Sequence, residues 1–206
     1  MSDNRWLEAE NHLKNNDETL ARFVERVGAC TLQPQEDPFE ALVLSIVCQQ
    51  LSVKAANTIW ERAKNVLKNE VTPKNVLAAE FDDLRGAGLS RQKATYVKNI
   101  AQAWTDGHVP AEDFEKMPDD EVAQALIQIK GVGAWTADMF LIFTLGRPDV
   151  LPVGDLSFRN VVKTIYGLDE LPEKDALEKI AESWRPWRSI GAWYCWRAMD
   201  TGLLNN

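Results

Sequence analysis

The chain has 206 residues, enough for one domain or for two small lobes that share a core, and 45% of them are hydrophobic. Its 31 acidic and 23 basic residues give a net charge of −8, which argues mildly against nonspecific binding of nucleic acid, because such binders usually present basic patches. The charge is unevenly distributed. Residues 84–105 carry four basic side chains and no acid, whereas residues 106–125 carry seven acids and one lysine. A basic patch on an acidic body is therefore compatible with the sequence.

The cysteines and histidines argue against a metal centre built from side chains. Cys30, Cys48 and Cys195 fit no C-x-x-C spacing and are too few for a four-cysteine iron–sulfur cluster, so free thiols in a reducing compartment are expected. His12 and His108 stand far apart in the sequence. Neither a signal peptide nor an apolar run of the ~20 residues that a membrane span needs is visible. The expected location is the cytoplasm or nucleoid of a bacterium, or the nucleus of a eukaryote.

Hydrophobic spacing predicts helices along nearly the whole chain. The residues before position 39 have a helical pattern, and the next segment places apolar side chains at i, i+3, i+4, i+7 and i+8, namely Phe39, Leu42, Val43, Ile46 and Val47. Helix starts are predicted at Thr72-Pro73 and Pro118-Asp119. Residues 135–145 are apolar nearly all round, as expected of a helix buried within a bundle. No segment alternates as a strand does, so the pattern predicts an all-α fold of about ten short helices.

Two glycines, Gly131 and Gly133, lie in the sequence IKGVG just before this apolar segment. Glycine tolerates positive φ, and two of them in a tight turn leave backbone N–H groups pointing outward at a helix N-terminus, where a phosphate can bind. An ordinary turn between two helices explains the same residues. The absence of a preceding strand and of a GK[ST] sequence excludes a P-loop. Residues 84–88 (LRGAG) repeat the apolar-basic-Gly-small-Gly pattern ahead of another helix.

Four motifs occur in order along the chain. Residues 126–137 fit L-x-x-I-K-G-V-G-x-W-T-A, and LPVGD places Asp155 beyond the apolar segment at the end of a loop that contains glycine and proline. The other two are WRPWRS at residues 184–189 and SIVCQQLS at residues 45–52. Together these motifs resemble the helix-hairpin-helix (HhH-GPD) superfamily of DNA glycosylases, in the branch of the 3-methyladenine DNA glycosylases II. The chain is similar to a compact form of that branch, without its N-terminal β-domain.

The resemblance implies a fold and an activity. The fold would be an all-α, two-lobed helical bundle: residues 1–38 and 147–206 would form one lobe, residues 39–146 a central lobe with the hairpin at about 126–137, and the active site would lie in the cleft between them. The activity would be hydrolysis of the N-glycosidic bond of alkylated purines, such as 3-methyladenine and 7-methylguanine, by base flipping. The implied partner is double-stranded DNA that contains alkylated bases, bound by a monomer and without a membrane. A non-catalytic DNA-binding hairpin module and a glycosylase for other damaged bases stay open as alternatives.

The resemblance assigns the chemistry to Asp155. Breaking an N-glycosidic bond builds positive charge on the sugar, and a carboxylate beside the sugar stabilises that charge and can orient an attacking water. A simpler interpretation is that Asp155 caps the helix that begins near Leu156, and both can hold at once. Arg159 lies four residues further on, where it can face the same side. It can hold the carboxylate, contact a phosphate, or form a structural or solvated ion pair.

Trp135 determines the predicted subtype. Family members that also cut the DNA backbone carry a lysine at this position, whose amine attacks the sugar, and tryptophan cannot do this. We therefore predict a monofunctional enzyme that leaves an abasic site. By the resemblance, Trp135 and Trp196 would flank the flipped base, since an alkylated purine is cationic and stacks well on a tryptophan face. Met139 stands where a relative has an aromatic residue, which leaves the shape of the base pocket open.

The resemblance also assigns the contacts with DNA. Gln50, or else Leu51, would fill the gap that a flipped base leaves, although the two glutamines can equally be the polar end of a helix, and Ser52 would cap the next helix. The N–H groups of Gly131 and Gly133 would hold the backbone. No cofactor is required, but a structural Na⁺ or K⁺ can bind carbonyl groups of the hairpin, which here would be those of Ile127, Ile129 and Val132. Arg85, Arg91 and Lys93 are weaker candidates for phosphate contacts, with a solvated face as the alternative.

Overall fold

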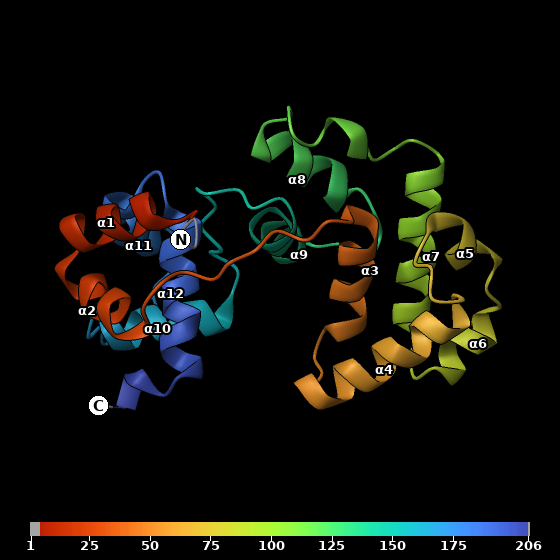
Figure 1. Ribbon diagram of the computed structural model, residues 1–206, viewed down its shortest axis with the longest axis horizontal. Helices are drawn as coiled ribbons and strands as arrows, with labels where there is room; N and C mark the ends of the chain where they lie inside the picture. The colour runs from red at the N-terminus through yellow and green to blue at the C-terminus, as the bar shows by residue number, and fades with distance from the viewer. Residues whose placement is uncertain (1–4, 206) are drawn as a thin grey trace. The chain divides into compact units, whose positions relative to one another are not determined.

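The computed structural model describes residues 5–205, and all regular structure in that range is helical (Figure 1). The predicted all-α fold is therefore confirmed. Twelve α-helices lie in the described range, against about ten predicted, and four of them have only six or seven residues. The helices fall into two compact units, residues 1–34 with 146–206 and residues 35–145. We refer to them as the terminal unit and the central unit.

The terminal unit is built around α12 (Arg188–Asp200). This helix packs against α2 (Glu18–Val27) and α10 (Leu156–Ile165), and α1 (Leu7–Asn16) and α11 (Lys174–Ile180) complete the unit (Figure 1). Nearly the whole first half of α12 is buried, including Tyr194, and so are Trp184 and Phe158. Such large side chains each remove extensive apolar surface from water, which is the main stabilisation of the unit.

Asp17 links the helices of the terminal unit by hydrogen bonds. Its Oδ1 accepts from the N–H of Leu20 at 2.9 Å, which caps α2, while its Oδ2 accepts from the Tyr166 hydroxyl at 2.6 Å and from Trp184 Nε1 at 2.9 Å. Burial is the largest cause that raises the pKa of Tyr166, followed by its hydrogen bond to Asp17. The N-cap of α2 is thereby tied to the C-terminal end of α10, the helix whose first residue follows Asp155.

The central unit is organised around α7 (Arg91–Thr105). It packs against α3 (Pro38–Cys48), α5 (Pro73–Ala78) and α6 (Phe81–Gly86), while α4 (Val53–Val66) packs on α3, and α8 (Asp119–Ile127) on α9 (Ala134–Met139) (Figure 1). The starts predicted at Thr72-Pro73 and Pro118-Asp119 are confirmed. Thr72 accepts the N–H of Asn75 at 3.2 Å, as an N-cap residue does.

The apolar segment 135–145 differs from the uniformly buried helix that its sequence predicts. It forms α9 and then a π-helical stretch, Phe140–Thr144. Phe140, Leu141 and Ile142 are buried, but the side chain of Trp135 at the start is 39% exposed. The exposed ring therefore lies at the end of the segment that follows the glycine-containing turn.

Candidate active site

The turn between α8 and α9 requires glycine at its first glycine position. Gly131 has φ +114°, a region that favours glycine, and a Cβ atom there would lie 2.2 Å from Cγ of Tyr96 on α7. The Asn99 side chain holds the same turn, because its Nδ2 donates to the Lys130 carbonyl at 3.0 Å. Packing against α7 thus fixes the turn and explains Gly131 without any ligand.

Gly133 has no such structural explanation. Its φ of −100° is open to any residue, and a Cβ atom there would meet nothing within 4 Å. Gly133 is the N-cap of α9 and provides no side-chain cap. Within residues 5–205, the N–H groups of Gly131 and Gly133 have no acceptor. The helix start therefore presents unsatisfied donors beside open space, which is the arrangement that binds an anion such as a phosphate.

A second turn, between α6 and α7, also has a glycine with positive φ three residues before its helix begins, but it has a different N-cap residue. In the repeated sequence pattern the counterpart of Gly131 is Gly86. In backbone geometry it is Gly88, whose φ is +112°. The alignment of the two turns by backbone geometry is therefore shifted by two residues from their alignment by sequence. Ser90 then stands in the position of Gly133, and its Oγ accepts the Lys93 N–H at 3.1 Å. The α6–α7 turn satisfies the start of its helix through Ser90, whereas the α8–α9 turn leaves the start of its helix open.

The loop that carries Gln50 lies against α9. Gln49 Nε2 donates to Thr136 Oγ1 at 3.3 Å, next to Trp135 in the sequence. Gln50 follows in the left-handed region, with φ +54°, and Leu51 is 37% exposed. Ser52 accepts the Ala55 N–H at 3.4 Å, so the predicted cap of α4 is confirmed. The central unit thus brings the loop and the start of α9 together, and it exposes the two residues proposed to fill a gap in DNA.

Met139, one turn beyond Trp135, lines a cavity of about 180 Å³ within the central unit. Ser45, Phe143 and Thr144 are among the other lining residues. The unbranched thioether of methionine adapts to irregular space, so the cavity has a less rigid wall than a ring would give it. A larger cavity of about 450 Å³, between α7 and α8, contains none of the predicted pocket residues.

In the terminal unit, Asp155 is the N-cap of α10. Its Oδ1 accepts from the Phe158 N–H at 2.6 Å and from Trp196 Nε1 at 3.2 Å. The cap that the sequence predicts is therefore confirmed, and α12 contributes a second donor to the same carboxylate. Trp196 had been predicted only as a wall of the base pocket. Its indole is half-buried and meets the Phe158 ring edge-on at 6.2 Å, so this residue also orients the carboxylate.

Arg159 makes the structural ion pair that was one of its predicted alternatives. Its Nη2 lies 2.7 Å from Glu173 Oε1, and its Nε donates to the Pro172 carbonyl at 2.9 Å. In the described part of the chain it forms no ion pair with Asp155. The prediction that Arg159 holds the carboxylate of Asp155 is therefore wrong, because its guanidinium pairs with Glu173 at the start of α11.

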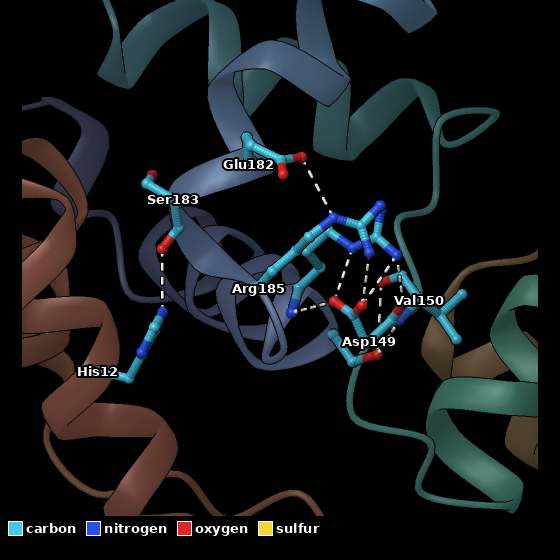
Figure 2. A network of polar contacts seen from close by, with 8 residues as sticks. His12, Asp149, Val150, Glu182, Ser183 and Arg185 are labelled. Atoms are coloured by element: carbon cyan, nitrogen blue, oxygen red, sulfur yellow. Dashed lines mark hydrogen bonds and ion pairs between the residues drawn. The ribbon is translucent and has the colours of Figure 1, made fainter.

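The loop that leads to Asp155 is fixed to the start of α12 by charged groups, as Figure 2 shows for Asp149 and Arg185. Asp149 accepts from Arg185 Nη1 at 2.8 Å and from Arg188 Nε at 2.7 Å. Val150 donates its N–H to Ser189 Oγ at 2.9 Å. The WRPWRS motif thus has a structural role, and Asp149, which the sequence analysis did not single out, is its acidic partner.

Asp138 is another residue that the sequence analysis did not identify as part of the site. It lies on α9 three residues after Trp135, hence on the same side of the helix. Within residues 5–205 its carboxyl group has neither a hydrogen bond nor an ion pair. Burial raises its pKa from 3.8 to about 6. The partly buried carboxyl group of Asp138 therefore costs stability when ionised, and no contact within residues 5–205 offsets that cost.

We expect Asp138→Asn to stabilise the protein at pH 7.5 by about 1–2 kcal/mol, after allowance for partial exposure of the group. Because the folded-state pKa is raised, the folded protein keeps this proton between pH 4 and pH 6 while the unfolded chain has lost it. Stability contributed by the protonated group is therefore lost as pH rises toward 6. The gain from Asn should vanish near pH 4 in denaturant unfolding. Asp82→Asn, at an exposed position, is the control, and an equal gain at both pH values would contradict the assignment.

Comparisons with known proteins place these features in a family. Residues 43–186 match the HhH-GPD superfamily of base excision DNA repair proteins. In Schizosaccharomyces pombe, DNA-3-methyladenine glycosylase 1 is 38% identical over 92% of this chain and 86% of its own length. The alkylbase DNA glycosidase-like protein mag2 of that organism is 33% identical over 95% and 94%.

Two solved structures of 3-methyladenine DNA glycosylases or glycosidases are also similar to this chain. The S. pombe 3-methyladenine DNA glycosylase (Mag1) in complex with abasic DNA matches with a TM-score of 0.83 and 37% identity, over 94% of this chain and 97% of that one. A DNA-3-methyladenine glycosidase from Bacillus halodurans matches with a TM-score of 0.84 and 33% identity, over 95% and 90%. Within residues 5–205, no helix is long and apolar enough to cross a membrane. The chain belongs to the HhH-GPD superfamily of base excision DNA repair proteins.

Proposed function

We propose that this protein is a monofunctional DNA glycosylase that flips alkylated purines, such as 3-methyladenine and 7-methylguanine, out of duplex DNA and hydrolyses their N-glycosidic bond. The observation that carries the proposal is the carboxylate of Asp155, held at the start of α10 by the Phe158 N–H and the Trp196 indole. Relatives with 37–38% identity are named 3-methyladenine DNA glycosylases, which supports alkylated purines as the substrate class.

The carboxylate of Asp155 is suited to the charge that this reaction creates. The sugar becomes positively charged as the bond to the base breaks, and a preoriented negative group stabilises that charge without having to reorganise. Two N–H donors from different helices fix the orientation of the carboxylate before the substrate arrives. The same group can orient the water that completes the hydrolysis.

The aromatic side chain of Trp135 is suited to the base. Alkylation of a ring nitrogen makes a purine cationic, so the base is already a good leaving group and requires no strong acid. A cation over an indole face gains about 0.5–2 kcal/mol, and the Trp135 ring is exposed enough to take part. Because tryptophan cannot form a Schiff base, the reaction ends at the abasic site.

The central unit supplies the proposed grip on DNA. The free N–H groups of Gly131 and Gly133 would bind a backbone phosphate, and Gln50 or Leu51 would enter the space that the flipped base leaves.

A monovalent cation can strengthen this grip. Within residues 5–205 the carbonyl oxygens of Ile127 and Val132 accept no hydrogen bond, and that of Ile129 accepts only the Val132 N–H at 2.9 Å. These three carbonyls fit a hard cation such as Na⁺ or K⁺, which would add positive charge beside the phosphate.

Asp155→Asn tests the catalytic role. Asparagine is an equally good N-cap, so the fold should persist. We expect release of 3-methyladenine from duplex DNA to fall about 10²–10³-fold while DNA affinity stays within about twofold of the wild type.

Asp37→Asn, at the N-cap of α3, is the matched control for an aspartate cap and should retain full activity. Base release by the Asp155 variant at the wild-type rate would exclude Asp155 as the catalytic group. Strong binding by a wild-type protein that releases no base would instead favour a non-catalytic DNA-binding module.

Borohydride trapping tests the monofunctional assignment. Without a lysine at position 135, the protein should form no covalent adduct with abasic-site DNA in sodium borohydride, and its product strand should break only after alkali. A bifunctional glycosylase run in parallel verifies the trap. A trapped adduct of this protein would show that another amine performs the lyase step.

Gly133→Ser tests the phosphate site by copying the turn at Ser90. The new hydroxyl should cap α9 and leave stability equal or a few tenths of a kcal/mol higher. The serine side chain would also fill the open space beside Gly133 in which the phosphate is proposed to bind, and so weaken duplex binding about tenfold. Thermal unfolding and fluorescence anisotropy measure the two effects. Unchanged affinity would mean that the start of α9 does not contact DNA.

A further inference from the structure

The ammonium group of Lys93 is bound by backbone carbonyls of the central unit. Its Nζ donates to the Val47 carbonyl at 2.7 Å and to the Gln49 carbonyl at 2.6 Å. Two of its three donors are thereby used inside the central unit. These bonds give Lys93 a structural role that the sequence analysis did not identify, and its contact with phosphate stays a prediction.

The repeated glycine turn explains how Lys93 reaches this position. Gly88 turns the chain and Ser90 caps α7 by accepting the Lys93 N–H, so Lys93 lies in the first turn of that helix. From there the side chain extends to the end of α3. The sequence LRGAGLSRQK thus places a lysine at the end of α3, which its similarity to the hairpin sequence does not predict.

The two carbonyls lie where a cation is most effective. The last carbonyl groups of a helix lack partners within it and carry partial negative charge, and an ammonium group there forms charge-assisted hydrogen bonds. The next residue, Gln50, has φ +54°, a backbone conformation that needs support from its surroundings. The loop is held on one side by Lys93 and on the other by the bond from Gln49 to Thr136.

We propose that Lys93 is a positioning residue that holds residues 49–51 in the conformation in which Gln50 or Leu51 enters the DNA. The proposal rests on the proposed function, because it needs a base to be flipped. Lys93 itself does not contact the DNA in this proposal. It acts by holding the loop whose residue fills the gap.

The chain contains a matched control on the same helix. Lys98 Nζ donates to the Leu77 and Ala79 carbonyls at 2.9 and 2.5 Å, at the end of α5. Burial lowers the pKa of both ammonium groups. The two lysines therefore make the same kind of bond at the end of a helix, but only Lys93 holds the loop with Gln50.

The test compares affinity for two duplexes, one with a stable tetrahydrofuran abasic site and one continuous. Only the first offers a gap to fill, so the ratio of the two affinities measures gap filling without any chemistry. We expect Lys93→Met to lower this ratio about tenfold, Lys93→Arg to restore much of it, and Lys98→Met to leave it within about twofold of the wild type. Thermal unfolding verifies that each variant is folded.

A wild-type ratio in folded Lys93→Met would overturn the proposal, and so would an equal fall in Lys98→Met. If Lys93→Met does not fold, Gln49→Met cuts the other tether of the loop and must lower the same ratio. Base release is measured separately. A wild-type protein that prefers the abasic duplex but releases no base would contradict the proposed function and leave the role of Lys93 intact.

Discussion

A helix leaves its first N–H groups without partners, and three helix starts in this chain meet that constraint in different ways. Ser90 caps α7 with its own hydroxyl, and the start is closed. Asp155 caps α10 with a carboxylate that Trp196 also holds, so one group serves the fold and is placed for chemistry. Gly133 caps nothing, and the start of α9 stays open. The proposed function uses two of these three helix starts: the carboxylate of Asp155 for the chemistry, and the open N–H groups at Gly133 for binding phosphate.

Helix ends show the complementary use of charge. The ammonium groups of Lys93 and Lys98 reach across the central unit to the last carbonyls of α3 and α5. In the terminal unit, Arg185 and Arg188 instead meet the carboxylate of Asp149, which fixes the loop before Asp155. Charged groups that look like surface residues in the sequence therefore hold the segments that carry the candidate site.

Local features could be predicted from the sequence and tertiary partners could not. The all-α fold and the caps at Ser52, Thr72 and Asp155 follow from spacing and residue type, which act over a few residues. Arg159 pairs with Glu173 and not with Asp155, which is nearer in the sequence, and Asp149 pairs with Arg185 and Arg188, 36 and 39 residues away. Such choices depend on how the helices pack.

The register of the two glycine turns shows a subtler limit. Their letters pair Gly86 with Gly131, but their backbones pair Gly88 with Gly131, since the sign of φ is not written in the sequence. Only the second pairing places Ser90 opposite Gly133. The sequence similarity of the two turns therefore did not show that one helix start is capped by a serine and the other has no side-chain cap.

The same contacts bear on how an acidic chain can hold DNA. Of the four basic residues between positions 84 and 105, Lys93 and Lys98 bond to carbonyls inside the central unit, which leaves Arg85 and Arg91 exposed. The two bonded lysines keep their charge, but Arg85 and Arg91 are the members of this set whose side chains are exposed to a ligand. Each phosphate neutralised by a side chain releases counterions and steepens the salt dependence of binding, whereas backbone N–H groups carry no full charge. On the proposed function, the open start of α9 and insertion into the gap add contacts that need no net positive charge, and insertion favours a duplex with a flipped base over an intact one.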